Sequence, residues 1–238
     1  MAFVIVFSIK SLNQTNQILH FFRYGVKKLA AVQRRSKKLS KLDMSRCQLS
    51  QNGFFELIPV LLKTEHVILQ GNHISPIELK IFSSQIRESK GGVVLKTLDI
   101  SSSNLTDESL QQIAKLAFLV ENIDLHNSSF GPDGVTMLVK CFHKFEGGVL
   151  KTLNLRMCKL TDQCLSILSE IIPYLNSVVL SSNNFGGSAG LKALAESIDT
   201  AEKRKLKHID LRHSRVGQEM KKVVNEVCRR HKIDLKIW

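Results

Sequence analysis

Prolines and long apolar runs are both scarce in this chain of 238 residues. Only four prolines occur, none of them clustered, and no low-complexity run interrupts residues 39–238. No apolar run approaches the roughly 20 residues that a membrane-spanning helix needs. The first apolar stretch, residues 2–9, lacks a positively charged start and a small-residue cleavage motif, so it is a poor signal peptide. We expect no linker within residues 39–238, no membrane span and a cytoplasmic location.

The short motifs of common enzymes are also missing. The chain has no H-E-x-x-H, no G-x-S-x-G and no C-x-x-C, and it contains no Gly-Lys dipeptide of the kind that phosphate-binding loops use. Its five cysteines, an odd number, do not suggest a disulfide framework. His208, His213 and His231 fall in adjacent parts of the pattern described below, but scattered surface histidines explain them better than a metal site. We therefore expect no enzyme activity, no cofactor and no metal.

What the sequence does contain is a repeat. The phrases L-K-T-L-D-I at residues 95–100 and L-K-T-L-N-L at residues 150–155 lie 55 residues apart, each shortly after a Gly-Gly pair. Degenerate copies of L-x-x-L-x-L-x-x-N/C-x-L recur through most of the chain, which is typical of a curved solenoid of strand-plus-helix units. The fourth pattern position is held in turn by Leu42, Val67, Leu98, Ile123, Leu153, Val178, Ile209 and, in a truncated last copy, Ile233. Intervals of 24 or 25 residues alternate with intervals of 30 or 31 residues, so the true period is a pair of units.

Each copy predicts a short strand followed by a helix. Alternating apolar residues such as Leu153 and Leu155 share one face of a strand. Further along the units, residues such as Leu191, Leu194 and Ile198 follow helical spacing. The strands should therefore form the core face, with each helix packed behind its own strand.

Particular residues mark the turns and the ends of the pattern. Thr106 and Thr161 each precede an aspartate, as expected at a helix start. Cys47 and Cys158 occupy the N/C position, where a small buried donor turns the chain out of the strand. Ile5 fits the pattern as one more copy, although its interval to the next copy is longer than any other.

Residues 150–216 resemble one specific kind of leucine-rich repeat. Residues 150–172 read L-K-T-L-N-L-R-M-C-K-L-T-D-Q-C-L-S-I-L-S-E-I-I, and residues 175–198 read L-N-S-V-V-L-S-S-N-N-F-G-G-S-A-G-L-K-A-L-A-E-S-I. Two repeat types alternate. One carries Cys or Ser at the turn (Cys47, Ser103, Cys158, Ser214) and the other carries Asn or Ser (Asn72, Ser128, Asn183). This alternation is similar to that of ribonuclease inhibitor and of the C-terminal repeats in NACHT-domain, NOD-like innate immune receptors.

The resemblance covers residues 39–238 and implies an α/β horseshoe with parallel inner strands, outer helices and about seven full repeats. Residues 1–38 would then be an N-terminal cap or a degenerate repeat that carries a basic segment. The serines that replace the commoner Asn or Cys are expected to loosen the turns locally. The nucleotide-binding motif of the receptor family is absent.

In the fold of that family, the strand positions outside the core line a concave surface. The resemblance therefore implies these partner-binding candidates: Ile68, Gln70, Asp99, Asp124, His126, Asn154, Arg156, Val179, Asp210, Arg212 and Lys236. Ile68 and Val179 are apolar where the neighbouring copies are acidic or amidic. The recurring aspartates, by contrast, favour a role within the strand column itself.

Arg156 and Arg212 are the first candidates among these residues, because arginine is enriched in binding hot spots. The competing interpretation is that they pair with the nearby Asp124 and Asp210. The sequence alone leaves both interpretations open.

The formal charge of +13 is concentrated near the N-terminus. Residues 1–46 contain ten Lys or Arg against one acidic residue, whereas residues 47–238 contain 24 against 20. The basic segment comprises Lys27, Lys28, Arg34, Arg35, Lys37 and Lys38. A solvated capping helix is the simplest interpretation, and contact with nucleic acid, acidic lipid or an acidic protein is the alternative.

Taken together, the sequence predicts a noncatalytic protein-binding scaffold whose partner it does not identify. The resemblance implies the ligand-sensing or autoinhibitory repeat region of a NOD-like receptor-type protein, or a fragment of one. The alternative is an adaptor of the cytoskeletal or ubiquitin-ligase substrate-recognition kind. A ribonuclease inhibitor is disfavoured, because inhibiting a basic enzyme needs an acidic inner surface and this chain is basic.

Overall fold

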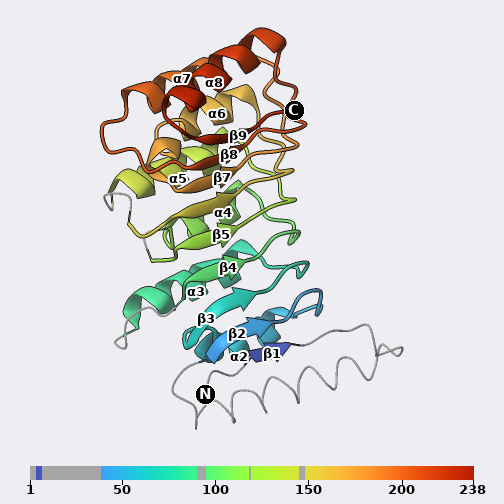
Figure 1. Cartoon of the computed structure of the whole chain (residues 1–238). Coiled ribbons are helices and arrows are strands. Elements are labelled where there is room, and N and C mark those ends of the chain that lie inside the picture. Colours follow the sequence, from blue (N-terminus) through green and yellow to red (C-terminus); the bar gives the residue numbers. More distant parts are fainter. Residues whose placement is uncertain (1–3, 7–38, 90–94, 118, 145–147) are drawn as a thin grey trace.

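Short parallel strands alternate with helices along the part of the chain that the structure describes. This computed structural model describes residues 4–6, 39–89, 95–117, 119–144 and 148–238. Within those residues, nine strands form one parallel sheet in chain order (Figure 1). They are β1 (Val4–Val6), β2 (Leu39–Asp43), β3 (Thr64–Ile68), β4 (Thr97–Asp99), β5 (Asn122–Asp124), β6 (Thr152–Asn154), β7 (Ser177–Val179), β8 (His208–Asp210) and β9 (Asp234–Lys236).

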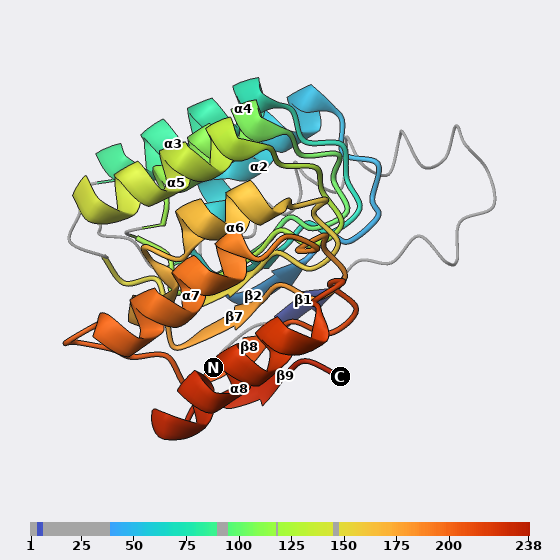
Figure 2. The same cartoon turned by 90° about the horizontal axis from the view of Figure 1, so that it is seen from above.

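Seven α-helices within the described residues lie on one side of this sheet, and Figure 2 shows them along the outside of the curve. They are α2 (Gln51–Leu61), α3 (Pro76–Glu88), α4 (Asp107–Ala114), α5 (Pro132–Lys144), α6 (Asp162–Leu168), α7 (Ala189–Thr200) and α8 (Gln218–Arg230), with a short 3-10 helix η2 (Ile172–Tyr174) after α6. The arrangement is the predicted leucine-rich repeat solenoid, with seven strand-plus-helix units from β2 to α8. No helix among the described residues is both long enough and apolar enough to cross a membrane.

The core runs the length of the sheet as a column of central strand residues. Leu98 pairs in register with Ile123, Ile123 with Leu153, and Leu153 with Val178. Each of these side chains is at most 2 % exposed. Period-two alternation places the residues on either side of them on the opposite face of the sheet. The helices therefore cover the core face and leave the concave face open.

The observed strand register agrees with the predicted one at the N-terminal end of the pattern and differs from it at the C-terminal end. In β1, Ile5 pairs in register with Leu42, at the place that the repeat pattern gave it. The assignment of Ile233 to the fourth position is wrong, because Leu235 is the residue that pairs with Ile209. Ile233 is buried as well, and a shift of two residues keeps the same face of a strand inward. Apolar alternation therefore could not separate the two registers.

Two buried asparagines, Asn183 and Asn72, link neighbouring turns at the edge of the solenoid where the strands end. We call each of them, with its four hydrogen bonds, an asparagine rung. Asn183 Oδ1 accepts bonds from the backbone N–H groups of Cys158 and Leu160, and its Nδ2 donates to the carbonyls of Leu155 and Leu180. Asn72 makes the equivalent four bonds around Cys47. These two rungs satisfy buried backbone groups that the turns leave unpaired.

The predicted buried cysteines lie beside these rungs. Cys47 and Cys158 are fully buried. Burial raises the pKa of the Cys47 thiol to about 11 and that of Cys158 to about 12, so both thiols stay protonated at neutral pH. The Cys158 thiol lies 3.3 Å from the carbonyl oxygen of Leu125, where it acts as the expected donor.

The turn serines do not behave alike. Ser214 Oγ donates to the carbonyl of Leu180 at 3.0 Å, and Ser103 Oγ donates to the carbonyl of Ser101 at 3.1 Å. Ser128 Oγ is buried and has no hydrogen-bond partner among the described residues.

Backbone angles at the turns alternate in the same two-type rhythm as the sequence. The turns at Cys47, Ser103, Cys158 and Ser214 each contain two residues with positive φ, as at Met157 and Lys159. Turns of the other type contain one, as at Ser182. On the helix side, the predicted starts are confirmed, because Thr106 and Thr161 are the N-caps of α4 and α6.

Candidate functional site

The open face of the sheet carries the residues that the sequence selected. The positions after the core column align strand by strand, so that Ile68 lies beside Asp99, Asp124 beside Asn154, and Val179 beside Asp210. Lys236 lies beside Asp210 in the register of the sheet, and its side chain is exposed. Ile68 and Val179 are separated by three strands and do not form one apolar patch. The structure thus brings the candidates into one polar row with isolated apolar members.

The aspartates of this row serve the turns that follow the strands. Asp99 Oδ1 accepts the backbone N–H of Ser101 at 3.0 Å and its hydroxyl at 2.6 Å. Asp124 Oδ1 accepts the backbone N–H of His126 at 3.0 Å and lies 2.9 Å from its Nδ1. Because these bonds reach two residues along the chain, they fix the path of the backbone. The interpretation of the aspartates as members of the strand column is supported.

Arg212 is held by its own strand. Its Nε and Nη2 donate to the two carboxylate oxygens of Asp210 at 3.0 and 2.8 Å. Burial acts to raise the pKa of Asp210, but the bonds from Arg212 outweigh it and hold that pKa below its ordinary value. The hydrogen bond to Asp210 raises the pKa of Arg212 in return. The competing interpretation of pairing therefore holds for this arginine.

Arg156 differs from Arg212 in having no carboxylate at hand. Its backbone N–H donates to Asn154 Oδ1 at 3.0 Å, but its exposed guanidinium bonds to no residue in the described part of the chain. Asp124 bonds to other groups instead, since its Oδ2 accepts a bond from Asn154 Nδ2 at 2.9 Å and its Oδ1 bonds to His126. Arg156 is thus an uncompensated cation on the open face.

The surroundings of Arg156 combine polar and apolar contacts. Backbone bonds from Asn127 N–H to Arg156 C=O, and from Met157 N–H to Ser181 C=O, place this turn between those of the neighbouring units. Met157 is 44 % exposed, and half-buried Val179 lies on the adjacent strand. Met157 was missed from the sequence, although it is apolar at a turn position that elsewhere holds Arg46, Gly71, Ser102, Asn127, Ser182 or His213.

Polar links stiffen the rest of the row. Gln70 Nε2 lies 3.4 Å from His126 Nε2, so these two side chains reach toward each other across the intervening unit. At the start of the strands, Lys96 pairs with Glu65 at 3.1 Å and Lys151 with Glu121 at 2.8 Å. The hydrogen bond from Lys151 holds the pKa of Glu121 below its ordinary value. These charges compensate one another, unlike Arg156.

The basic segment made of Lys27, Lys28, Arg34, Arg35, Lys37 and Lys38 lies outside the described residues. Within the described residues, no three His, Cys, Asp or Glu side chains are placed to share a metal ion. The candidate surface is therefore an array of hydrogen-bonding groups in which Arg156 is an exposed arginine without an ion pair among the described residues.

Comparison with known proteins agrees with this architecture. The sequence profile described as "Leucine Rich repeat" matches residues 94–114, a segment that contains β4 and α4. A search among curated proteins gives no match. Proteins built from these repeats commonly serve as protein-binding scaffolds.

Proposed function

We propose that the chain is a noncatalytic scaffold that binds a protein partner along the concave face of the sheet, with Arg156 at the centre of the contact. The observation that carries this proposal is the free guanidinium of Arg156, in contrast to that of Arg212 at the same pattern position, which is paired with Asp210. A partner carboxylate could bind it in a bidentate manner, as arginine favours. Val179 and Met157 would supply apolar contacts around that bond.

Within this proposal, the solenoid serves as the ligand-sensing or autoinhibitory repeat region of a NOD-like receptor-type protein. The support is the two-type alternation, which recurs in the sequence and in the positive-φ turns. Five free cysteines fit a reducing cytoplasm. The repeat architecture of the described residues supplies a rigid curved surface, as a sensor region requires.

The test replaces Arg156 with glutamate and compares it with Lys192→Glu as a control. Lys192 is exposed on α7, on the outer side, so this variant makes the same charge change away from the concave face. Both variants should melt at the temperature of the wild-type protein. Proteins captured in cells by proximity labelling are then compared, and the specific partner is expected to remain with Lys192→Glu and to be lost from Arg156→Glu.

Binding to that purified partner should weaken by roughly 30-fold or more in Arg156→Glu, the effect expected of a central hot spot. A partner retained equally by both variants would contradict the proposal and move the search to the helices. Loss from both variants would show that general charge, and not the concave face, controls the binding.

A further inference from the structure

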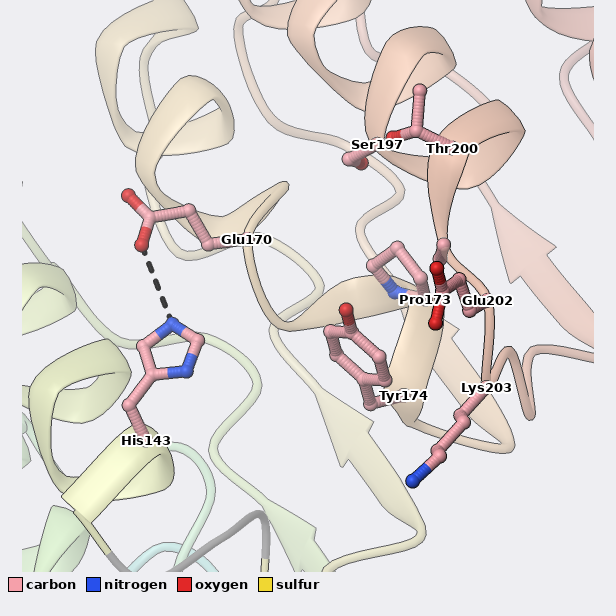
Figure 3. Close-up of a pocket in the computed structure, with 9 residues that line it drawn as sticks. His143, Glu170, Pro173, Tyr174, Ser197, Thr200, Glu202 and Lys203 are labelled. Carbon is pink, nitrogen blue, oxygen red and sulfur yellow. Dashed lines mark hydrogen bonds and ion pairs between the residues drawn. The ribbon is translucent and has the colours of Figure 1, made fainter.

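A second site lies on the edge of the solenoid where the helices end. There a pocket of about 670 Å³ opens among residues from the ends of α5, α6 and α7, from η2 and from the segment after α7 (Figure 3). None of the nine lining residues belongs to a strand, so this pocket is separate from the concave face. Its volume falls within the range of about 300–1,000 Å³ that small-ligand sites occupy.

The electrostatics of the pocket favour a cation. Glu170 lies just beyond the end of α6, and Glu202 just beyond the end of α7. The C-terminus of α6 carries a partial negative charge that adds to Glu170. At the end of α7, by contrast, the guanidinium of Arg204 donates to the carbonyls of Ile198 and Ala201. Glu170 lies 3.3 Å from His143 Nε2, whereas Glu202 makes no ion pair or hydrogen bond within the described part of the chain. A single ammonium group, that of Lys203, opposes the two carboxylates.

The walls of the pocket favour a cation on a long apolar stem. In the view of Figure 3, the ring of Tyr174 lies between Glu170 and Glu202, with Pro173 beside it. Tyr174 is partly buried and packs against the core, so its ring is held in place. An aromatic face attracts a guanidinium, and the aliphatic stem of an arginine can lie along such a surface.

Other ligand classes fit the pocket less well. A phosphate or carboxylate would meet the charges of Glu170 and Glu202 and the C-terminal end of α6. A divalent metal would lack ligands, because no group of three metal-binding side chains exists among the described residues. A planar guanidinium can bind carboxylates in a bidentate manner and stack on a ring, which an ammonium cannot do equally well.

We propose that this pocket receives an arginine side chain of a partner protein. The guanidinium contacts the carboxylate of Glu202, and the stem of the side chain lies along Tyr174, while Glu170 adds negative charge across the pocket. This pocket is separate from the concave surface. The proposal for the pocket can therefore hold if the proposal for the concave surface fails, and the reverse is also true.

The experiment uses the full chain and two blocked peptides, N-acetyl-Gly-Arg-Gly-amide and its citrulline twin. Citrulline has nearly the shape of arginine but no charge. Backbone amide shifts of the protein are followed by NMR as each peptide is added. Because the chain carries a net charge of +13, general electrostatics disfavour a cationic peptide, so saturable binding reports a local site. We expect a dissociation constant on the order of 1 mM for a single anchor residue, with shifts centred on residues 200–203.

Three variants make the test specific. Glu202→Gln should weaken binding of the arginine peptide roughly tenfold, because it removes a charged hydrogen-bond acceptor. Lys203→Met should strengthen binding by removing the opposing charge. Glu196→Gln, a change at an exposed position of α7 outside the pocket lining, should leave binding unchanged.

The proposal is overturned if the citrulline peptide binds as well as the arginine peptide, or if the shifts centre on another part of the chain. It is also overturned if Glu202→Gln binds like the wild-type protein. Loss of partner binding in Arg156→Glu does not bear on these results, because that variant leaves the pocket intact.

Discussion

At the scale of single residues, one missing side-chain amide separates Ser128 from the two asparagine rungs. Ser128 stands at the pattern position of Asn72 and Asn183, and its side chain is 7 % exposed. Asn183 satisfies four backbone groups, whereas the hydroxyl of Ser128 bonds to none in the described part of the chain. Ser128 therefore replaces none of the four bonds that Asn183 makes, and its own hydroxyl is a buried polar group without a partner in the described part of the chain.

Replacing Ser128 with asparagine should therefore stabilise the protein. The new amide would face the backbone of Ser103 and Leu105, which hold the positions that Cys158 and Leu160 hold around Asn183. We expect the free energy of unfolding to rise by about 1–3 kcal/mol, as several net hydrogen bonds form and a buried mismatch is removed. Urea denaturation measures the change.

The reciprocal variant, Asn183→Ser, is the matched control. It should lower the free energy of unfolding by at least about 2 kcal/mol, because it leaves buried backbone groups without partners. If Ser128→Asn unfolds at a lower urea concentration than the wild type, the turn has no room for the amide. An asparagine at this position then does not form the bonds that Asn183 forms.

The two arginines show which residue-level distinctions a sequence can carry. Arg156 and Arg212 share a residue type and a pattern position, and both were selected. What separates them is the residue two positions earlier, since Asp210 offers two charged oxygens and Asn154 offers one neutral oxygen. That signal was present in the sequence, but reading it required knowing that this position bonds two residues onward.

At the scale of elements, glycines set how closely paired helices approach. Gly131 and Gly134 face Asp107 at the start of α4, and Gly187 and Gly190 face Asp162 at the start of α6. A Cβ on Gly134 would lie 2.8 Å from Asp107 Oδ1 and 2.9 Å from its Cα. The same G-x-x-G spacing thus allows α5 to pack on α4 and α7 on α6.

Gly190→Ala should separate α6 from α7 and destabilise the protein. Its added Cβ would clash with the backbone carbonyl oxygen of Asp162, and that carbonyl belongs to the first turn of α6. We expect a loss of about 1–3 kcal/mol, the usual cost of overpacking a close contact. A lower melting temperature by circular dichroism is the readout.

Gly186→Ala provides the comparison for this variant, because its Cβ would meet only Asn184 Oδ1, at 3.7 Å. That substitution should change the melting temperature little. Equal melting of the two alanine variants would mean that the helices can move apart at no cost and that the glycines do not limit their approach.

The presence of a strand and a helix in each unit could be predicted because every unit repeats one pattern. Apolar residues recur with a different spacing in strands and in helices, so the two could be told apart. The register of β9 could not be predicted, since Ile233 and Leu235 are equivalent in a period-two pattern. The pocket was missed for another reason. Three of its residues lie outside the repeated pattern: Glu170 and Tyr174 follow α6, and Glu202 follows α7. Only the packing of the helix ends places them around one pocket.

At the scale of the whole molecule, stability depends on contacts between neighbouring units. The buried apolar residues form one cluster from Leu39 to Ile237, but each strand pairs only with the strands before and after it. Stability in such a solenoid is close to a sum of unit terms and nearest-neighbour terms. A defect in a central unit therefore removes two interfaces, and a defect in β9 affects the single interface that the described sheet gives it.

Leu153→Ala tests this dependence against Leu235→Ala, a change in the same core column. Leu153 is fully buried in β6 between β5 and β7, whereas Leu235 in β9 is only partly buried. We expect Leu153→Ala to cost about 2–5 kcal/mol of unfolding free energy, through lost burial and a cavity, and Leu235→Ala to cost less.

Hydrogen exchange in Leu153→Ala should show protection falling most in β5, β6 and β7 and least toward β2, because a nearest-neighbour chain passes damage on with diminishing effect. A uniform loss of protection over all described strands would instead show that the solenoid opens as one cooperative unit. In that case the unit-by-unit account of its stability would be wrong.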